Sequence, residues 1–353
     1  MFESLGFETL TAPQAAVYFA LALGLVFGVL AQITRFCFRR SIVGDDRRQA
    51  AGVWLTALAV AVLGTQGAVA MGWIGFAEHR FMAADLPVLA IVAGGLLFGA
   101  GMVLTRGCVS RLTVLTGSGN LRAALVLVVF AVVAHATLKG VLAPVRTTLG
   151  SVTWSLDSTA LPGAPLVWAA VIALAALAVA LRSGNRAGTL ALAALIGALV
   201  PLGWVGTGYV LLDEFDPIAM ESLSFTSAAA EALFFTVAST SISATFGAAL
   251  IGAVALGALV SSLIRGEFAW VSFGSPRETG RYMSGAALMG VGGVLAGGCT
   301  VGAGLSGIPT LSIAAILAIA AIAAGGLITN RLLSATASAP GAQATTQAAL
   351  PAE

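Results

Sequence analysis

The sequence predicts an all-α integral membrane protein, and three observations support this. Hydrophobic residues make up 59% of the 353 residues, whereas charged residues make up only 9%. The mean hydropathy is +1.00. The apolar residues also form long unbroken runs, while a soluble domain carries about a quarter charged residues. A soluble enzyme, a secreted disulfide scaffold and a nucleic-acid binder therefore fit poorly, and a lipid bilayer is the expected surrounding.

A helix needs about 20 mostly apolar residues to cross a bilayer. The sequence contains nine such runs, at roughly 15–33, 50–72, 87–105, 122–142, 165–182, 187–209, 243–264, 281–297 and 309–331. The stretch from Met1 to Gln14 has no lysine or arginine, so we expect the first run to remain as a helix and not to be a cleaved signal peptide. Residues 1–333 would form a single transmembrane transporter domain, followed by a disordered cytoplasmic tail at 334–353.

Nine spans place the two termini on opposite sides of the membrane, and each basic residue can then be assigned to one side. One side carries 14 of the 17 basic residues, and the other carries only Arg80, Lys139 and Arg146. Because cytoplasmic loops are rich in lysine and arginine, we expect the arginine-rich side in the cytoplasm of a bacterial inner membrane. The N-terminus would lie outside and the C-terminus inside. The 14 residues are Arg35, Arg39, Arg40, Arg47, Arg48, Arg106, Arg111, Arg122, Arg182, Arg186, Arg265, Arg277, Arg281 and Arg331.

Two glycine-rich stretches resemble each other, 94–117 and 284–307, and each contains a Gly-Cys pair. Aligning Cys108 with Cys299 also aligns Gly107 with Gly298. Because the two cysteines end spans on opposite sides, the repeats are expected to be inverted. Repeat one would cover about 14–143 (spans 1–4) and repeat two about 187–331 (spans 6–9), with a linker span at about 164–183. A competing match between 31–38 and 261–268 would place both segments on one side, and we treat it as chance.

Four short segments fall between the spans, at about 36–43, 108–118, 226–241 and 299–307. We expect them to be short re-entrant helices, with Ser227 near the position that matches Cys37. Inverted repeats with broken helices are typical of transporters, whose substrate sites lie near the middle of the membrane. Irregular backbone at that depth is tolerated only where protein buries it or where it lines a polar cavity.

The three cysteines each lie where a helix ends or a short one begins. Glycine allows backbone to approach a ligand closely, a helix N-terminus favours an anion, and a thiol is a weak, soft donor. We therefore expect a path for a small anion with a soft atom such as sulfur. Its residues would be Cys37, Cys108, Cys299, Arg39, Arg106, Gly107, Gly298 and Thr300. The alternatives are that the cysteines are buried as small apolar groups and that the arginines only orient the chain.

Other chemistry has little support in the sequence. The three cysteines and seven methionines lack metal-binding spacing, and only two histidines are present. We therefore expect no metal site, no cofactor and no catalytic residues. His135 lies inside the fourth span and Glu231 in the outer short segment; either could carry protons, or His135 could simply be packed and Glu231 could face water.

The motifs FCFRR at 36–40, LTRGCVSRL at 104–112 and GGCTVGAGLSG at 297–307 resemble those of the YeeE/YedE family. The resemblance implies nine spans with re-entrant helices in an inverted repeat, forming an hourglass. It also implies that three essential cysteines, here Cys37, Cys108 and Cys299, pass thiosulfate along by S–H contacts. TusA-type cytoplasmic sulfurtransferases are often encoded beside such proteins, so one is a possible partner.

The leading hypothesis is a transporter or channel-like facilitator that imports thiosulfate or a related small sulfur anion, and not an enzyme. One alternative is a membrane sulfur relay that forms a cysteine persulfide for a cytoplasmic sulfurtransferase. The other is a transporter for selenium anions or sulfite.

Overall fold

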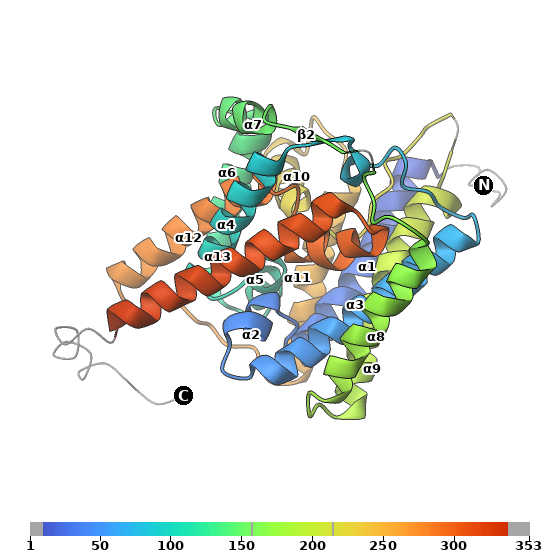
Figure 1. The fold of residues 1–353 in the computed structure, drawn as a ribbon. Coiled ribbons are helices and arrows are strands. Elements are labelled where there is room, and N and C mark those ends of the chain that lie inside the picture. The colour runs from blue at the N-terminus through green and yellow to red at the C-terminus, as the bar shows by residue number, and fades with distance from the viewer. Residues whose placement is uncertain (1–9, 157, 214, 338–353) are drawn as a thin grey trace.

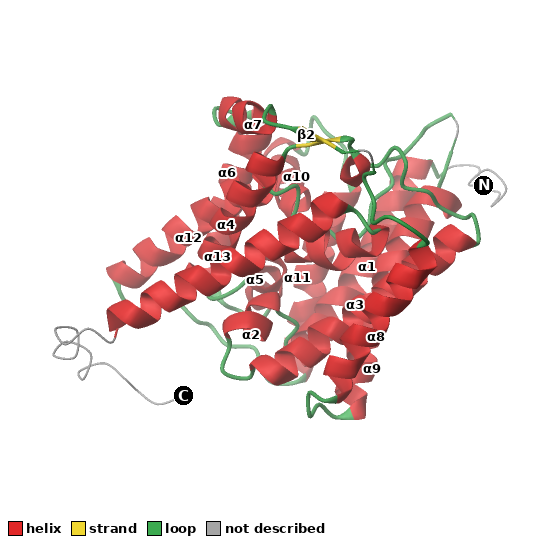
Figure 2. Cartoon of the chain, in the orientation of Figure 1, coloured by secondary structure: helices red, strands yellow, loops and turns green. Residues whose placement is uncertain are grey.

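The computed structural model describes residues 10–156, 158–213 and 215–337, and almost all of this chain is helical (Figure 2). Each of the nine expected spans is a helix, so the all-α membrane fold class is confirmed. The long helices are α1 (Ala12–Thr34), α3 (Arg47–Ala70), α4 (Val88–Leu104), α6 (Leu121–Lys139), α8 (Pro165–Leu181), α9 (Ala187–Val205), α11 (Phe246–Ile264), α12 (Pro276–Leu295) and α13 (Ile313–Ala337).

In the described chain, eight helical stretches are long and apolar enough to cross a bilayer, with α4 joined to the short helix Val109–Gly117 that follows it. Taken alone, α4 and α8 have 17 residues each, which is about the lower limit for a span. Of the long helices named above, only α8 lies outside these eight stretches. Its two flanks nevertheless lie at opposite ends of the bundle. Before α8, the backbone carbonyl of Thr159 accepts from the N–H of Ile313 at 3.1 Å. After α8, the Asn185 amide donates to the Gln49 carbonyl at 2.9 Å. The helix therefore runs from one end of the bundle to the other.

The four expected short segments are also present. They are α2 (Phe38–Val43), α5 (Val109–Gly117), α10 (Thr226–Ala238) and η4 (Thr300–Gly307). The last is a π-helix, which continues into the 3₁₀ turn η5 (Ile308–Thr310). Every residue of the π-helical η4 is buried, so its irregular backbone does not meet lipid. The second half of α10, in contrast, exposes Phe234 and Val237. Figure 1 shows α2 and α5 near the middle of the bundle.

Several elements differ from the expectation. An additional helix, α7 (Ala143–Gly150), follows α6 and carries no buried residue. Small elements at the same end are η2 (Arg80–Met82) and the pair β1 (Asp85–Leu86) and β2 (Trp154–Ser155), which is antiparallel; the π-helical η3 (Gly206–Val210) extends α9. The last helix runs to Ala337, beyond the expected start of the tail at Ser334. The rest of that tail, 338–353, lies outside the described residues.

The helix pairs follow a two-fold pattern. Helix α1 packs on α11 as α9 packs on α3, and α4 packs on α13 as α12 packs on α6. The short helices obey the same exchange, since α2 packs on α3 and α13 while α10 packs on α11 and α6. If each helix of spans 1–4 is exchanged with its counterpart in spans 6–9, the same pairs of helices remain in contact. In Figure 1, α4, α12 and α13 form one group and α1, α3, α8 and α9 another.

The two repeats run in opposite directions. The guanidinium of Arg48, at the start of α3, donates to the carbonyl of Arg182 at 2.7 Å. Helix α1 therefore ends at the end of the bundle where α9 begins. We call this the arginine-rich end. At the opposite end, the hydroxyl of Ser312 donates to the carbonyl of Phe81 at 2.6 Å.

Glycines allow the exchanged pairs to approach closely. A Cβ atom on Gly28 of α1 would lie 2.2 Å from the carbonyl oxygen of Val254 in α11. A Cβ atom on Gly197 of α9 would lie 2.2 Å from the carbonyl oxygen of Ala57 in α3. Small residues are the usual means by which membrane helices pack backbone against backbone. The α1–α11 and α9–α3 contacts thus both depend on a glycine that faces the backbone of the partner helix.

Candidate functional site

Each of the three cysteines begins a short helix. Cys37 is the N-cap of α2, Cys108 of α5 and Cys299 of η4. All three are free thiols and buried. The Cys299 sulfur accepts from the backbone N–H of Gly302 at 3.4 Å. It thus occupies the place that an oxygen takes in an ordinary N-cap, whereas Cys37 and Cys108 make no side-chain capping hydrogen bond.

The chain reverses two residues before each cysteine. Arg35, Arg106 and Gly297 all adopt the left-handed conformation, with φ of 52°, 58° and 73°. This is the usual way to end a helix, and glycine suits it because it has no Cβ. For the two arginines the conformation costs about 1–2 kcal/mol each. The same turn therefore places all three cysteines at the start of the following helix.

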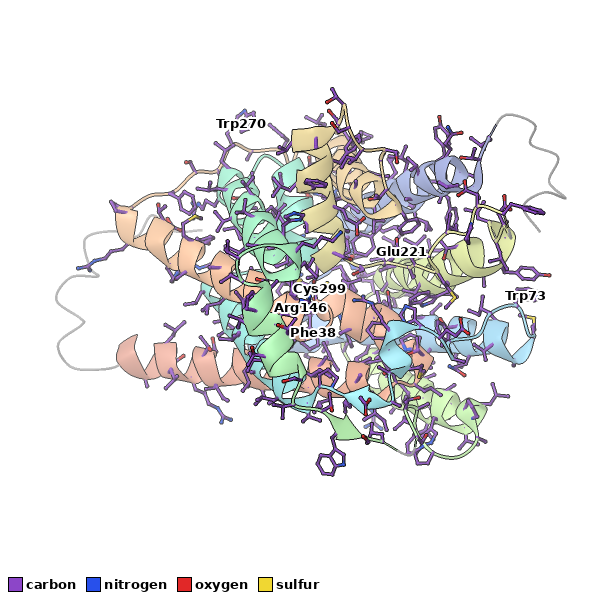
Figure 3. All side chains as sticks on the ribbon, turned by 90° about the horizontal axis from the view of Figure 1, so that it is seen from above. Phe38, Trp73, Arg146, Glu221, Trp270 and Cys299 are labelled. Atoms are coloured by element: carbon purple, nitrogen blue, oxygen red, sulfur yellow. The ribbon has the colours of Figure 1, made fainter. Side chains whose placement is uncertain are left out.

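Cys108 connects the other two cysteines. Its thiol interacts with the Cys37 thiol and lies against Thr300, the residue that follows Cys299. It also forms a hydrogen bond with the Ser110 hydroxyl at 3.3 Å. The site therefore joins thiols from both repeats. Figure 3 shows Cys299 in the interior of the molecule, while Trp73 and Trp270 lie at its periphery.

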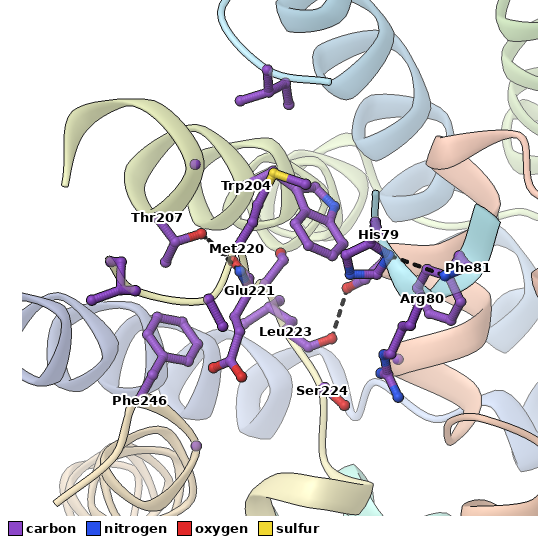
Figure 4. Close-up of a pocket in the computed structure, with 18 of the residues that line it drawn as sticks. His79, Arg80, Phe81, Trp204, Thr207, Met220, Glu221, Leu223, Ser224 and Phe246 are labelled. Atoms are coloured by element: carbon purple, nitrogen blue, oxygen red, sulfur yellow. Dashed lines mark hydrogen bonds between the residues drawn. The ribbon is translucent and has the colours of Figure 1, made fainter. Parts of the chain in front are cut away.

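A cavity of about 900 Å³ lies on one side of these thiols. We call it the Glu-lined cavity, because Glu78, Glu221 and Glu231 line it. Ser224 and Gly302 also line it, and a Cβ on Gly302 would lie 3.0 Å from Ser224 Oγ and 3.8 Å from Cys299 Sγ. The floor of this cavity therefore reaches Cys299. Figure 4 shows part of its wall.

A second cavity, of about 880 Å³, lies at the arginine-rich end. We call it the Arg-rich cavity. Its lining includes Arg35, Arg39, Arg40 and Arg111, together with Asp45, Asp46 and Glu267. Arg111 acts electrostatically on both Cys37 and Cys108, so it lies between this cavity and the thiols. Arg40 forms an ion pair with Asp46 and lowers the pKa of that carboxyl.

Several buried polar atoms in and around these cavities have no hydrogen-bond partner within the described chain. They include the hydroxyls of Ser224, Thr226 and Thr300 and the Nε–H of Arg39. A buried unpaired donor typically costs about 1–3 kcal/mol, so each such group in a native structure calls for an explanation. Ser224 lies at the Glu-lined cavity, Thr300 beside Cys108 and Arg39 at the Arg-rich cavity. Donors for a bound anion are thus available at three points along the cysteines.

The structure separates the residues expected to act together. Arg39 lines the Arg-rich cavity, but Arg106 does not and is exposed. Its charge acts on Glu278. Gly107 is buried, with room for a Cβ at 3.4 Å from Leu112. Gly298 packs tightly, since its Cβ would lie 2.9 Å from the backbone nitrogen of Ala303.

Two other expectations concern isolated titratable groups. The ring of His135 stacks on Phe234, with centroids 5.2 Å apart, which is a packing role. The carboxylate of Glu231 accepts from the hydroxyl of Thr245 at 2.6 Å and lines the Glu-lined cavity. Ser227, expected to match Cys37, lies in the first turn of α10, whose N-cap is Phe225.

Three residues beside the thiols or in the cavities, Arg111, Arg80 and Glu221, are not among the path residues predicted from the sequence. For Arg111 the available signal is its spacing, since it lies three residues after Cys108 and so one turn into α5. For Arg80 the signal is its rarity as one of three basic residues on its side. Nothing in the sequence marks Glu221, which reaches the cavity through the long connection between η3 and α10.

Comparisons with known proteins point in one direction. A family model described as sulphur transport matches residues 33–328. The chain is also 25% identical over 347 residues to the thiosulfate transporter TsuA of Spirochaeta thermophila. The match covers 86% of this chain and 94% of that protein.

Proposed function

Because this chain belongs to the sulphur transport (YeeE/YedE) family, we propose that it imports thiosulfate through its three thiols. The observation that carries the proposal is their order between the two cavities. Cys299 meets the Glu-lined cavity, Cys108 lies against Thr300 and Cys37, and Arg111 links these thiols to the Arg-rich cavity. The name of the relative from Spirochaeta thermophila supports thiosulfate as the substrate.

The chemistry of the path suits such an anion. Thiosulfate has one soft terminal sulfur and three hard oxygens. The thiols offer weak S–H donors to the soft atom, and the unpaired hydroxyls of Ser224 and Thr300 offer O–H donors to the oxygens. Between the cavities the anion meets thiols, hydroxyls and backbone N–H groups, which hold it weakly enough to leave, and Arg111 is the charged group on the side of the Arg-rich cavity.

The direction of transport follows from the orientation. We place the arginine-rich end in the cytoplasm on the basis of the loop charges. The anion then enters the Glu-lined cavity from outside and leaves toward four arginines. A cytoplasmic sulfurtransferase is a suitable acceptor at that exit.

Uptake of labelled thiosulfate into proteoliposomes tests the proposal. Cys37→Ser, Cys108→Ser and Cys299→Ser should each reduce uptake, and the triple variant should reduce it to the level of empty liposomes. Thermal stability of each purified variant serves as the folding control. Uptake by the triple variant equal to that of the wild type would refute the cysteine path. Excess unlabelled sulfite or selenite should compete less well than thiosulfate; the reverse order would assign the path to those anions.

One observation favours a sulfur relay as a second candidate. The guanidinium of Arg111 acts on both Cys37 and Cys108, and a nearby cation is what a reactive thiolate requires. In a relay, a cysteine thiolate attacks the sulfane sulfur of thiosulfate, the S–S bond breaks, and sulfite leaves with the bonding electron pair. The cysteine keeps the sulfur as a persulfide, with the total charge unchanged. Intact-mass spectrometry after turnover distinguishes the two: a persulfide adduct supports the relay, and unmodified thiols support passage.

A further inference from the structure

The Glu-lined cavity carries an unusual set of charges for the entry of an anion. Its titratable lining residues are Glu78, His79, Arg80, Glu221 and Glu231. Burial, with a smaller contribution from Arg80, lowers the pKa of His79 to about 4, so this imidazole is neutral at pH 7. One cation then faces three carboxyl groups. If all three are ionised, the cavity is negative and repels the substrate proposed above.

Arg80 is placed to attract that substrate. It is the one arginine or lysine among the cavity-lining residues in the described chain. Its guanidinium lies over the Phe81 ring, 5.0 Å from the centroid, and no ion pair of Arg80 is found in the described residues. Arg80 also acts electrostatically on Cys299, Glu221 and Glu231. It therefore lies in the wall of the cavity, within electrostatic reach of the first thiol of the path.

Glu221 is held by its backbone and free at its carboxylate. The Thr207 hydroxyl donates to the carbonyl of Glu221 at 2.7 Å and accepts from its N–H at 2.9 Å. In the described chain we find no hydrogen bond or ion pair of the side chain. In Figure 4 it points into the cavity, while Arg80 approaches from the opposite wall. Glu231 differs, because its carboxylate is held by the hydroxyl of Thr245.

The surroundings also keep Glu221 close to protonation. Burial, aided by the charge of Glu231 and opposed by that of Arg80, raises its pKa to about 7. Glu78 is exposed, so water and salt screen its charge. Glu221 is therefore the carboxyl in this cavity whose charge changes near neutral pH.

We propose that Arg80 and Glu221 form an anion-and-proton site at the entrance of the path. Arg80 binds the incoming sulfur dianion, and Glu221 takes up a proton as the anion arrives. This inference rests on the proposed thiosulfate transport and adds its first recognition site. The coupling is reciprocal: protonation of Glu221 tightens anion binding, and a bound anion raises the proton affinity of Glu221.

The pH dependence has a definite sign. Thiosulfate remains a dianion near neutral pH, so the titrating partner is the protein. With a pKa of about 7, the protonated fraction of Glu221 falls from about nine-tenths at about pH 6 to about one-tenth at about pH 8. Uptake at limiting thiosulfate should therefore fall about ninefold over this range, since only the protonated fraction binds.

The experiment measures thiosulfate uptake by proteoliposomes with equal pH inside and outside, so that no proton gradient contributes. Glu221→Gln should remove the pH dependence and take up thiosulfate at about pH 8 as fast as the wild type does at about pH 6. Glu78→Gln removes a carboxylate from the same cavity and should keep the wild-type profile. Arg80→Gln should raise KM about tenfold or more at every pH, and Arg80→Lys should recover part of the loss.

A wild-type pH profile in Glu221→Gln would overturn the inference, as would an unchanged KM in Arg80→Gln. A second measurement needs no variant: adding thiosulfate to weakly buffered wild-type protein at about pH 7.5 should take protons from solution, and no proton uptake would also overturn it. Absence of thiosulfate uptake by the wild type would instead refute the proposed function.

Discussion

The two cavities are nearly equal in size and opposite in chemistry. One measures about 900 Å³ and is lined by three glutamates and one arginine; the other measures about 880 Å³ and is lined by four arginines and three acidic residues. The two-fold packing of the repeats explains the similar size. The charged side chains on the loops and short helices, which differ between the repeats, explain the difference in charge. The helix packing thus provides two cavities of similar size, and the side chains make one cavity more acidic and the other more basic.

The largest effects should come from breaking the packing that makes the two halves similar. Gly28→Ala and Gly197→Ala each place a Cβ 2.2 Å from a carbonyl oxygen of the facing helix. Overpacking of this kind typically costs about 1–3 kcal/mol, and both variants should show a clearly lower melting temperature. Gly252→Ala, on α11, adds a Cβ with nothing within 4 Å and should be neutral or slightly stabilising, because alanine favours helix. Equal stability of the three variants would contradict the packing.

A smaller effect, on thiosulfate uptake, should come from removing an arginine at the arginine-rich end. Arg111 lines the Arg-rich cavity beside the thiols, whereas Arg106 is exposed and outside it. A hydrogen bond to a charged group is worth about 1.5–3 kcal/mol, so Arg111→Gln should reduce thiosulfate uptake about 10- to 100-fold. Arg106→Gln removes the same charge on the other side of Cys108 and should stay within about twofold of the wild type. A larger loss of uptake in Arg106→Gln than in Arg111→Gln would mean that the anion passes Arg106 and not Arg111.

The smallest effect tests the region where the two halves meet. Thr300→Val keeps the shape but removes a buried hydroxyl that has no hydrogen-bond partner among the described residues. Uptake should fall about 2- to 10-fold, as expected for one neutral hydrogen bond, while the melting temperature should rise because an unpaired polar group is lost. In the control Thr113→Val, the lost hydroxyl donates to the Val109 carbonyl at 3.0 Å within α5. That variant should not gain stability, and a similar response of both would mean that Thr300 has no role in the path.

The sequence predicts the spans well, because the length of an apolar run directly reflects the thickness of the bilayer. It also places Cys108 and Cys299 at the starts of short helices, because a Gly-Cys pair interrupts the apolar run at each of them. The surface helix α7 was missed, since APVRTTLG is neither apolar nor long. The π-helical form of η4 was missed as well, because glycine-rich composition indicates irregular backbone without specifying which kind.

Which arginine faces the thiols could not be predicted from the sequence. Arg106 and Arg111 flank the same cysteine, and the packing of distant segments around them leaves Arg106 exposed while Arg111 lines the Arg-rich cavity. Glu221 is harder still, because its place depends on a hydrogen-bonded pairing with Thr207, 14 residues earlier. Cavities formed between distant segments leave no local pattern in the sequence.

The packing of first-repeat helices on second-repeat helices also determines when each helix can find its partner during biosynthesis. Helix α1 ends at Thr34, but its partner α11 begins only at Phe246. At about 5–20 residues per second, the ribosome needs about 10–40 seconds to deliver that partner. Helix α4 waits likewise for α13. The first half must therefore stay in the membrane with its glycine faces uncovered until the second half emerges, and a truncated chain would have no partner with which to finish folding.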